Sequence, residues 1–199
     1  VKSCVQDSSG NAGNAVAAYA ARAGIKCEIF VPEGTSPSKI RMIESHGAKV
    51  NVVPGTRDHC ADVCRAKVRD EGAYYANLHN PFFYEGMKAY IYETLEQLGR
   101  IPAHIVVPVG NGTLFIGVVK ALEHLENPAN RKFPQIIALQ SENCDPLYRA
   151  VKTHDAHPAS IVPKPTMAEG IAIGVPIAAM IARHELSPHI AFVRAPEEK

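Results

Sequence analysis

Several features that would assign this chain to a special class are scarce or missing in its 199 residues. It has no tryptophan, only 7% of it is aromatic, and 21 basic side chains stand against 20 acidic ones. A chain with so little net charge has no field that would draw it to DNA, RNA or an acidic membrane. No apolar run reaches the ~18 residues that a membrane helix needs. We therefore expect neither a nucleic-acid partner nor a membrane partner.

The beginning of the chain also lacks an initiator Met and the apolar stretch of a signal peptide. This start indicates processing or further residues before Val1. The five cysteines are odd in number and lack the spacing of a disulfide scaffold, so we expect free thiols and a cytoplasmic protein. With 46% apolar and 21% charged residues, the composition is that of a globular protein with a core.

Strand and helix patterns alternate along the chain. The Ala-rich run 10–23 predicts a helix that ends at Gly24, and the apolar run 27–31 predicts a buried strand closed by Pro32. Further strands are predicted at 49–53, 73–77, 104–109, 135–140 and 189–193. Further helices are predicted at 37–46, 58–69, 84–98, 114–125, 145–151 and 176–184, with a proline-rich loop at 152–165.

Repeated strand–helix–strand units predict an α/β protein with parallel sheets and helices on both faces. After the long helix that ends at Gly99, a second series of such units begins. We therefore expect two open three-layer α/β/α domains, 1–98 and 99–199.

The first candidate site is the segment Ser8-Ser9-Gly10-Asn11 at the start of the Ala-rich helix. Ser9 or Asn11 could cap this helix, and its free backbone N–H groups could bind an anion such as a carboxylate. An ordinary capped turn explains the same residues equally well.

The second candidate, Gly110-Asn111-Gly112-Thr113, lies directly after a predicted strand and before a helix. The glycines allow the backbone to approach a ligand, the helix start supplies N–H donors, and Thr113 adds a hydroxyl. A phosphate binds at this place in an open α/β sheet. The sequence is neither a dinucleotide fingerprint nor a Walker loop. A tight turn without a ligand remains the alternative.

The third candidate is the stretch 166–176 (TMAEGIAIGVP), which places Glu169 among glycines and small residues. This composition suggests that the backbone approaches a flat ligand closely. The alternative is a glycine-rich connection with a solvated Glu169.

Two other kinds of site are disfavoured. His59, Cys60 and Cys64 could line one helix face as soft metal ligands, but a fourth ligand at a suitable spacing is missing, so we expect no metal site. A hydrolase is disfavoured because there is no G-x-S-x-G motif.

Taken in order, these segments resemble the fold-type-II pyridoxal-phosphate enzymes, the superfamily of the tryptophan synthase β subunit and threonine synthase. The resemblance rests on SSGNAG at 8–13, VPEG at 31–34 with KIRMIESHGAKV at 39–50, YEGMK at 84–88, VPVGNGT at 107–113 and TMAEGIAIG at 166–174. It covers nearly the whole chain. Within the superfamily the pattern is most similar to threonine synthase, while threonine dehydratase and serine racemase share most of it.

The resemblance implies pyridoxal 5′-phosphate as the cofactor and a smaller, mobile first domain, and makes a homodimer possible. It implies that the phosphate is cradled by Gly110, Asn111, Gly112 and Thr113. It also implies that Glu169 and Gly170 lie near the pyridine ring, that Asn11 hydrogen-bonds the 3′ oxygen, and that the substrate carboxylate is held by Ser8, Ser9 and Gly10.

The same resemblance indicates a chain that is cut short at both ends. The family's Schiff-base lysine stands well before the asparagine loop, whereas only seven residues precede Ser8, and Lys2 has neither the context nor the distance. The family's Ser or Thr that faces the pyridine nitrogen comes later than Lys199. We therefore expect no catalytic residue in this span, weak cofactor binding without a covalent bond, and no activity of the span alone.

The implied function is a pyridoxal-phosphate-dependent lyase of the threonine-synthase type, which converts O-phosphohomoserine to threonine by eliminating phosphate and adding water. One alternative is an enzyme similar to threonine dehydratase or serine racemase. Another is a non-catalytic relative that binds a phosphorylated small molecule or a partner protein. A purely structural domain would make the two glycine loops coincidental.

Overall fold

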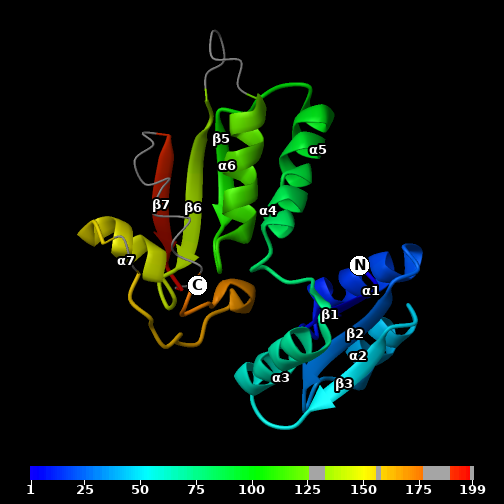
Figure 1. Cartoon of the computed structure of the whole chain (residues 1–199). Helices are drawn as coiled ribbons and strands as arrows, with labels where there is room; N and C mark the ends of the chain where they lie inside the picture. Colours follow the sequence, from blue (N-terminus) through cyan, green and yellow to red (C-terminus); the bar gives the residue numbers. More distant parts are fainter. Residues whose placement is uncertain (126–132, 156–157, 177–188, 198–199) are drawn as a thin grey trace. The chain divides into compact units, whose positions relative to one another are not determined.

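The computed structural model describes residues 1–125, 133–155, 158–176 and 189–197. The chain forms two compact units, Val1–Asn80 and Pro81–Lys199, and each is built on its own parallel sheet (Figure 1). This division comes earlier than the boundary expected after residue 98. The reason is that the helices between Pro81 and Leu98 pack on a helix of the second unit.

The first unit has a four-stranded sheet in the order β3-β2-β1-β4, with all pairs parallel. Its elements are β1 (Ser3–Gln6), α1 (Asn11–Arg22), β2 (Lys26–Pro32), α2 (Pro37–Glu44), β3 (Lys49–Val53), α3 (Arg57–Glu71) and β4 (Tyr74–Tyr75). Apolar side chains of α1 and α2, such as Ala17 and Ile43, are buried in one core cluster. On α3, Cys60 and Cys64 are buried in a second cluster, with Val5 of β1. Helices therefore cover both faces of this sheet, as predicted.

The second unit has a parallel sheet in the order β5-β6-β7. Its elements are α4 (Pro81–Met87), α5 (Ala89–Leu98), β5 (His104–Pro108), α6 (Thr113–Leu125), β6 (Gln135–Ser141), α7 (Pro146–Thr153), the 3₁₀ helix η1 (Glu169–Ile171) and β7 (Ile190–Ala195). The part of the predicted helix 176–184 that follows Pro176 lies outside the described residues.

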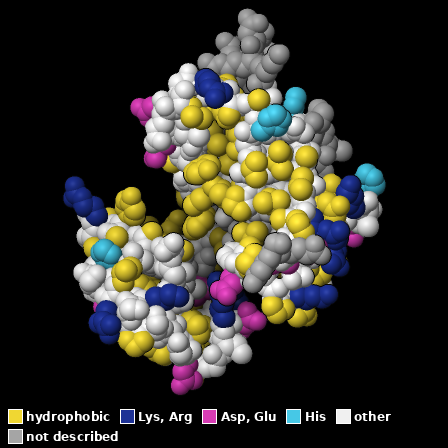
Figure 2. All heavy atoms as spheres, turned by 180° about the vertical axis from the view of Figure 1, so that it is seen from behind, with side chains coloured by type: hydrophobic (Ala, Val, Ile, Leu, Met, Phe, Trp, Pro, Cys, Tyr) yellow, Lys and Arg dark blue, Asp and Glu magenta, His cyan; other side chains and the backbone are white. Residues whose placement is uncertain are grey.

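The core of the second unit lies between α6 and one face of its sheet. Phe115 and Leu122 of α6 are buried in the same cluster as Val107 of β5. Because successive strand residues point to opposite faces, Val106 and Val193 lie on the other face, where they are 56% and 41% exposed. Figure 2 shows hydrophobic side chains gathered on the back of the molecule as drawn. As far as the described residues go, this second face stays apolar and open.

The helical stretch predicted at 84–98 is present and ends at Leu98, but it is divided into two helices, α4 and α5, which meet at Lys88. The N–H of Lys88 donates to the carbonyl of Glu85 at 3.3 Å, and that of Ile91 donates to the carbonyl of Lys88 at 3.0 Å. This three-residue spacing tightens the chain as a 3₁₀ turn does. The buried Lys88 ammonium pairs with the Glu85 carboxylate and lies 3.1 Å from Nδ1 of His124, near the end of α6.

Two strands of the first unit also differ from expectation. The strand predicted at 73–77 shrinks to Tyr74–Tyr75, although the N–H of Ala76 still donates to the carbonyl of Val5 at 3.0 Å. The strand β1 was not predicted, because Ser3 and Gln6 make it half polar. Gln6 is nevertheless only 1% exposed, since β1 lies between β2 and β4.

We expect Gly117→Ala to destabilise the second unit. A Cβ at Gly117 would lie 2.3 Å from Met87 Cβ and 2.9 Å from the Met87 carbonyl carbon. The helices α4 and α6 would have to separate, and overpacking of this kind costs about 1–3 kcal/mol. Urea denaturation measures the change. The matched control is Gly86→Ala, since no described atom lies within 4 Å of a Cβ there; equal losses in both variants would contradict the predicted clash.

Candidate functional site

The turn that joins β5 to α6 carries the second candidate segment. Gly112 has a φ of +93°, a conformation that glycine adopts without strain. Asn111 Oδ1 accepts hydrogen bonds from the N–H of Thr113 at 3.0 Å and from its hydroxyl at 2.9 Å. These bonds close the turn and cap the start of α6. The hydroxyl hydrogen of Thr113, which the sequence suggested for a ligand, is therefore taken by Asn111.

The same turn also carries backbone donors for which the described part of the chain offers no acceptor. No described residue accepts a hydrogen bond from the N–H of Gly110, Asn111, Gly112 or Leu114. Adjacent unsatisfied N–H groups at a helix start, with the helix dipole behind them, bind an anion. This donor set fits the phosphate group of the expected cofactor.

The third candidate segment, 166–176, which we call the late segment, packs directly on this turn. A Cβ built on Gly110 would lie 3.0 Å from Ile171 Cα, 3.2 Å from Ile173 Cγ1 and 3.5 Å from the carbonyl oxygen of Gly170. A side chain at position 110 would require these neighbours to move by a few tenths of an ångström, so glycine favours this close approach. Glu169 and Gly170 are exposed beside it. The fold of the second unit thus brings the second and third candidate segments together, at the end of the sheet where β5 and β6 lead into their loops (Figure 1).

The first candidate segment forms the turn between β1 and α1, in the first unit. Gly10 is the cap residue, and no side chain caps α1, so the expected cap by Ser9 or Asn11 is wrong. Asn11 is already the first helical residue. The Ser8 hydroxyl accepts a hydrogen bond from the N–H of Gly10 at 3.3 Å. The first N–H groups of α1 therefore keep their capacity to bind a carboxylate.

The Ser8 carbonyl folds back over the first turn of α1. A Cβ at Gly13 would lie 1.9 Å from this carbonyl oxygen and 3.2 Å from Ile29 Cγ2. The close approach of Ser8 to the helix therefore requires glycine at position 13.

Two residues beside this turn were not predicted from the sequence. Asp7, directly before Ser8, accepts hydrogen bonds from the Tyr75 hydroxyl at 2.5 Å and from the side-chain amide of Asn77. Burial, together with the bond to Asp7, raises the pKa of Tyr75. In addition, Oδ1 of Asn14 is buried, and no described residue donates a hydrogen bond to it. Asp7 follows the carboxyl end of β1, where polar side chains of open α/β sheets meet ligands. The sequence did not signal this place, because the strand β1 itself was not predicted.

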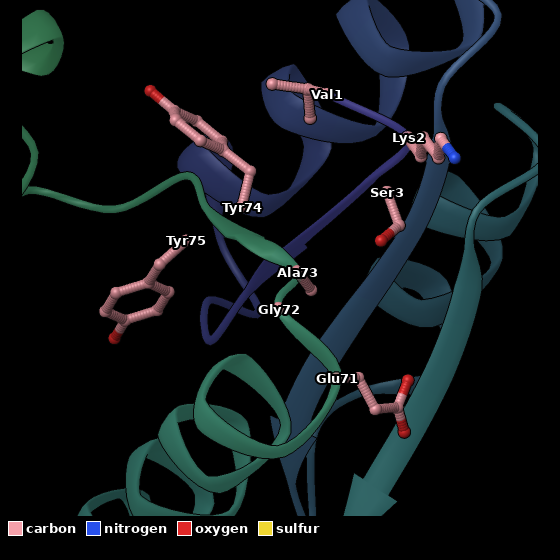
Figure 3. A pocket seen from close by; sticks show the side chains of 8 residues that line it. All are labelled: Val1, Lys2, Ser3, Glu71, Gly72, Ala73, Tyr74 and Tyr75. Atoms are coloured by element: carbon pink, nitrogen blue, oxygen red, sulfur yellow. The ribbon is translucent and has the colours of Figure 1, made fainter.

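A hollow of about 570 Å³ also opens in the first unit, lined by residues 1–3 and 71–75 (Figure 3). It lies toward the amino-terminal ends of β1 and β4, whereas the Ser8 turn follows the carboxyl end of β1. Ligands of open α/β sheets bind outside the carboxyl ends of the strands. We therefore do not assign this hollow to the candidate site.

The residues considered as metal ligands do not converge. Cys60 and Cys64 are buried, whereas His59 on the same helix is exposed. Burial raises the pKa of the Cys64 thiol to about 12, which disfavours the thiolate that metal binding needs. Across the described ranges, no group of three His, Cys, Asp or Glu residues could hold a metal ion.

All five cysteines of the chain are free and buried. Within the described part of the chain, none of the helices combines the length and apolar character required to cross a bilayer.

Comparison with known proteins places these residues in a wider context. The family described as pyridoxal-phosphate dependent enzyme matches residues 1–198. Threonine synthase from Methanocaldococcus jannaschii is 30% identical over 173 residues, which cover 85% of this chain and 43% of that protein. Threonine synthase from Halalkalibacterium halodurans is 30% identical over 171 residues, covering 85% and 46%. The chain thus spans less than half the length of these relatives.

Solved structures share the fold at lower identity. Threonine deaminase isoform 2 from Solanum lycopersicum superposes with a TM-score of 0.81 at 22% identity, covering 97% of this chain and 55% of that one. Maize serine racemase superposes with a TM-score of 0.76 at 23% identity, covering 97% and 56%. Both agree with the parallel α/β architecture described above.

Proposed function

This chain belongs to the family of pyridoxal-phosphate dependent enzymes, and from that premise we propose that it is part of an amino-acid lyase that forms threonine from O-phosphohomoserine. The observation that carries the proposal is the turn around Gly110–Thr113, where no described residue accepts a hydrogen bond from the N–H groups of Gly110, Asn111, Gly112 and Leu114. Gly110 of this turn lies close to Gly170 and Ile171 of η1. The similarity to threonine synthases adds the reaction. The proposal includes a cytoplasmic homodimer, in keeping with the free cysteines.

In the second unit, the candidate residues would bind the phosphate group and the pyridine ring of the cofactor. The amides of Gly110, Asn111, Gly112 and Leu114 would bind the phosphate, while Asn111 and Thr113 hold the shape of the turn. Gly170 would let the backbone approach the pyridine ring, since no described atom fills the position of its Cβ. Glu169 would lie at the edge of that ring.

In the first unit, the start of α1 would bind the amino-acid substrate. The N–H groups of the first turn of α1 would hold its carboxylate, with Gly10 and the hydroxyls of Ser8 and Ser9 beside them. The Asn11 amide would donate a hydrogen bond to the 3′ oxygen of the cofactor. When it is bound, pyridoxal phosphate supplies an electron sink for the substrate's α-carbon.

The buried Lys88 does not provide the Schiff base in this proposal. Its ammonium pairs with Glu85 and lies beside His124, whereas the phosphate turn is at Thr113, the other end of α6. At about 1.5 Å per residue, the two ends are roughly 16 Å apart. We therefore assign the covalent lysine to no residue of this span, and we expect the span alone to be inactive.

The reaction is tested on the full-length protein supplied with pyridoxal phosphate. With O-phosphohomoserine we expect inorganic phosphate, seen by ³¹P NMR, and threonine in equal amounts. With L-threonine alone we expect no 2-oxobutanoate. Formation of 2-oxobutanoate without phosphate release would replace the proposal by a threonine-dehydratase reaction. Turnover of neither substrate, with no binding of the cofactor, would favour a non-catalytic relative.

A further inference from the structure

Three separate segments of the second unit converge on one carboxylate, that of Glu197. The Ser141 hydroxyl donates to its Oε1 at 2.5 Å, and the Thr166 hydroxyl donates to the same oxygen. The N–H of Met167 donates to Oε2 at 3.2 Å. Ser141 is the last residue of β6, Glu197 follows β7, and Thr166 begins the late segment. One side chain therefore joins the ends of two strands to the segment that leads to Glu169.

A second set of bonds holds the same segment just before Thr166. The Asn143 side chain donates to the carbonyl of Pro165 at 2.6 Å, and the N–H of Lys164 donates to the carbonyl of Asn143 at 3.0 Å. The backbone of Glu197 is fixed as well, because its N–H donates to Oε1 of Glu142 at 2.7 Å. Residues 164–167 are thus tied to the β6 and β7 ends through side chains that the sequence pattern did not single out.

The restraint continues from Thr166 into the candidate site. Thr166 Oγ1 accepts a hydrogen bond from the N–H of Ala168 at 3.0 Å, and the carbonyl of Ala168 accepts one from the N–H of Ile171 at 3.0 Å. Ile171 Cα lies against Gly110, as described above. The path from Glu197 to the phosphate turn is therefore continuous within one unit.

The segment needs this restraint, because it has little burial of its own. Met167 is 77% exposed, and Ala168, Glu169 and Gly170 are also exposed. A stretch with so little buried apolar surface is ordered by its hydrogen bonds.

We propose that Glu197 is a positioning residue: its carboxylate fixes residues 166–171 against the phosphate turn and thereby sets where Glu169 and Gly170 meet the bound cofactor. The identity of that cofactor rests on the proposed function, whereas the hydrogen bonds do not.

The hydrogen bonds that the Glu197 carboxylate accepts depend on pH. The hydrogen bonds from Ser141 and Thr166 lower the pKa of Glu197. A carboxylate whose pKa is lower in the folded state stabilises the fold at pH values above the ordinary pKa of glutamate. This contribution is lost as the pH falls through the folded-state pKa. Order in residues 166–171 should therefore fall in acid. The other acidic group at this place, Glu142, faces the backbone of Glu197, so the variant Glu197→Gln is needed to assign the effect.

The test uses the full-length protein and four variants. Glu197→Ala removes the carboxylate, and Glu197→Gln keeps the shape but removes the charge and one acceptor. Glu96→Gln, at an exposed position of α5, is the matched control. Amide hydrogen exchange of residues 166–171 is measured without cofactor, and binding is measured for pyridoxal phosphate and for inorganic phosphate. Thr166→Ser, which keeps the hydroxyl, should behave as the wild type.

For Glu197→Ala we expect about tenfold faster exchange at Met167 and Ala168 and about tenfold weaker binding of pyridoxal phosphate, the equivalent of one hydrogen bond to a charged group. Binding of inorganic phosphate should change little, because the Gly110 turn remains. In Glu197→Gln, the protection factors of these amides, which are corrected for the intrinsic pH dependence of exchange, should no longer vary with pH in the acid range. Unchanged exchange in both variants would overturn the inference, and so would faster exchange with unchanged cofactor binding.

The two proposals fail in different ways. If the wild-type protein does not bind pyridoxal phosphate, the proposed function fails, and the exchange of the cofactor-free protein still decides whether Glu197 holds the segment. If the wild type binds the cofactor and Glu197→Ala matches it in exchange and affinity, only the role of Glu197 fails.

Discussion

Replacing Gly13 by alanine should displace the Ser8 turn and abolish most of the substrate binding that we assign to the first unit. The new Cβ would lie 1.9 Å from the Ser8 carbonyl oxygen, a backbone atom that cannot rotate away. It would also press on Ile29, a fully buried residue of β2. Either the turn or the helix α1 has to move, and overpacking of this kind costs about 1–3 kcal/mol of folding free energy.

The consequence for activity should be larger than the consequence for stability. A displacement of about 1 Å at a binding group lowers the rate about 100-fold, so we expect that loss in kcat/KM for the amino-acid substrate. Affinity for inorganic phosphate, which belongs to the second unit, should not change. Gly10→Ala is the control for folding, because a Cβ at Gly10 would meet only Ser8 Oγ, at 3.9 Å. A Gly13→Ala protein with wild-type stability and wild-type kinetics would contradict the geometry of this turn.

The second large effect is expected for Gly110→Val. Its branched side chain would begin 3.0 Å from Ile171 Cα and would have to push η1 away from the phosphate turn. The turn would lose its alignment toward an anion, and losing two hydrogen bonds to a charged group amounts to about 3 kcal/mol, or roughly 100-fold in affinity. Titration with inorganic phosphate and with pyridoxal phosphate should show this loss for both ligands.

In the same experiment, Gly170→Ala distinguishes binding of the cofactor's phosphate group from binding of its pyridine ring. No described atom lies near the position of its Cβ, so folding should be unchanged. If the cofactor ring approaches the backbone at Gly170, this variant should bind inorganic phosphate normally and pyridoxal phosphate weakly. Loss of both ligands in Gly170→Ala, or of neither in Gly110→Val, would contradict the arrangement of the two segments.

Much of the fold could be predicted because its signals are local. Gly24 and Gly99 have a φ of +64° just after α1 and α5, a conformation that ends helices and favours glycine. The apolar run of β2 and the proline at the start of α2 are equally local. The strand β1 escaped prediction because its burial comes from its neighbours β2 and β4 rather than from its own composition. The break at Lys88 escaped because it depends on contacts between α4 and α6.

The candidate site shows the same contrast. Its second segment stands in a turn between a strand and a helix, as the order of residues predicted. The bond from Thr113 to Asn111 could not be predicted, because a hydroxyl beside a helix start serves a ligand or a cap equally well. The bonds from Glu197 to Ser141 and Thr166 join residues far apart in the chain, and a single sequence carries no signal for such a contact. The role of each predicted residue toward a ligand stays a prediction.

The close contacts of Gly13 with Ser8 and of Gly110 with Ile171 involve main-chain atoms. A binding site held in this way can exchange its surrounding side chains during evolution and keep its shape. Substrate preference can then drift while the anion-binding turns stay the same, and one added methyl group at either glycine is harder to accept than a new functional group nearby. An engineer who wishes to change the substrate should therefore vary the side chains around these turns and leave the two glycines alone.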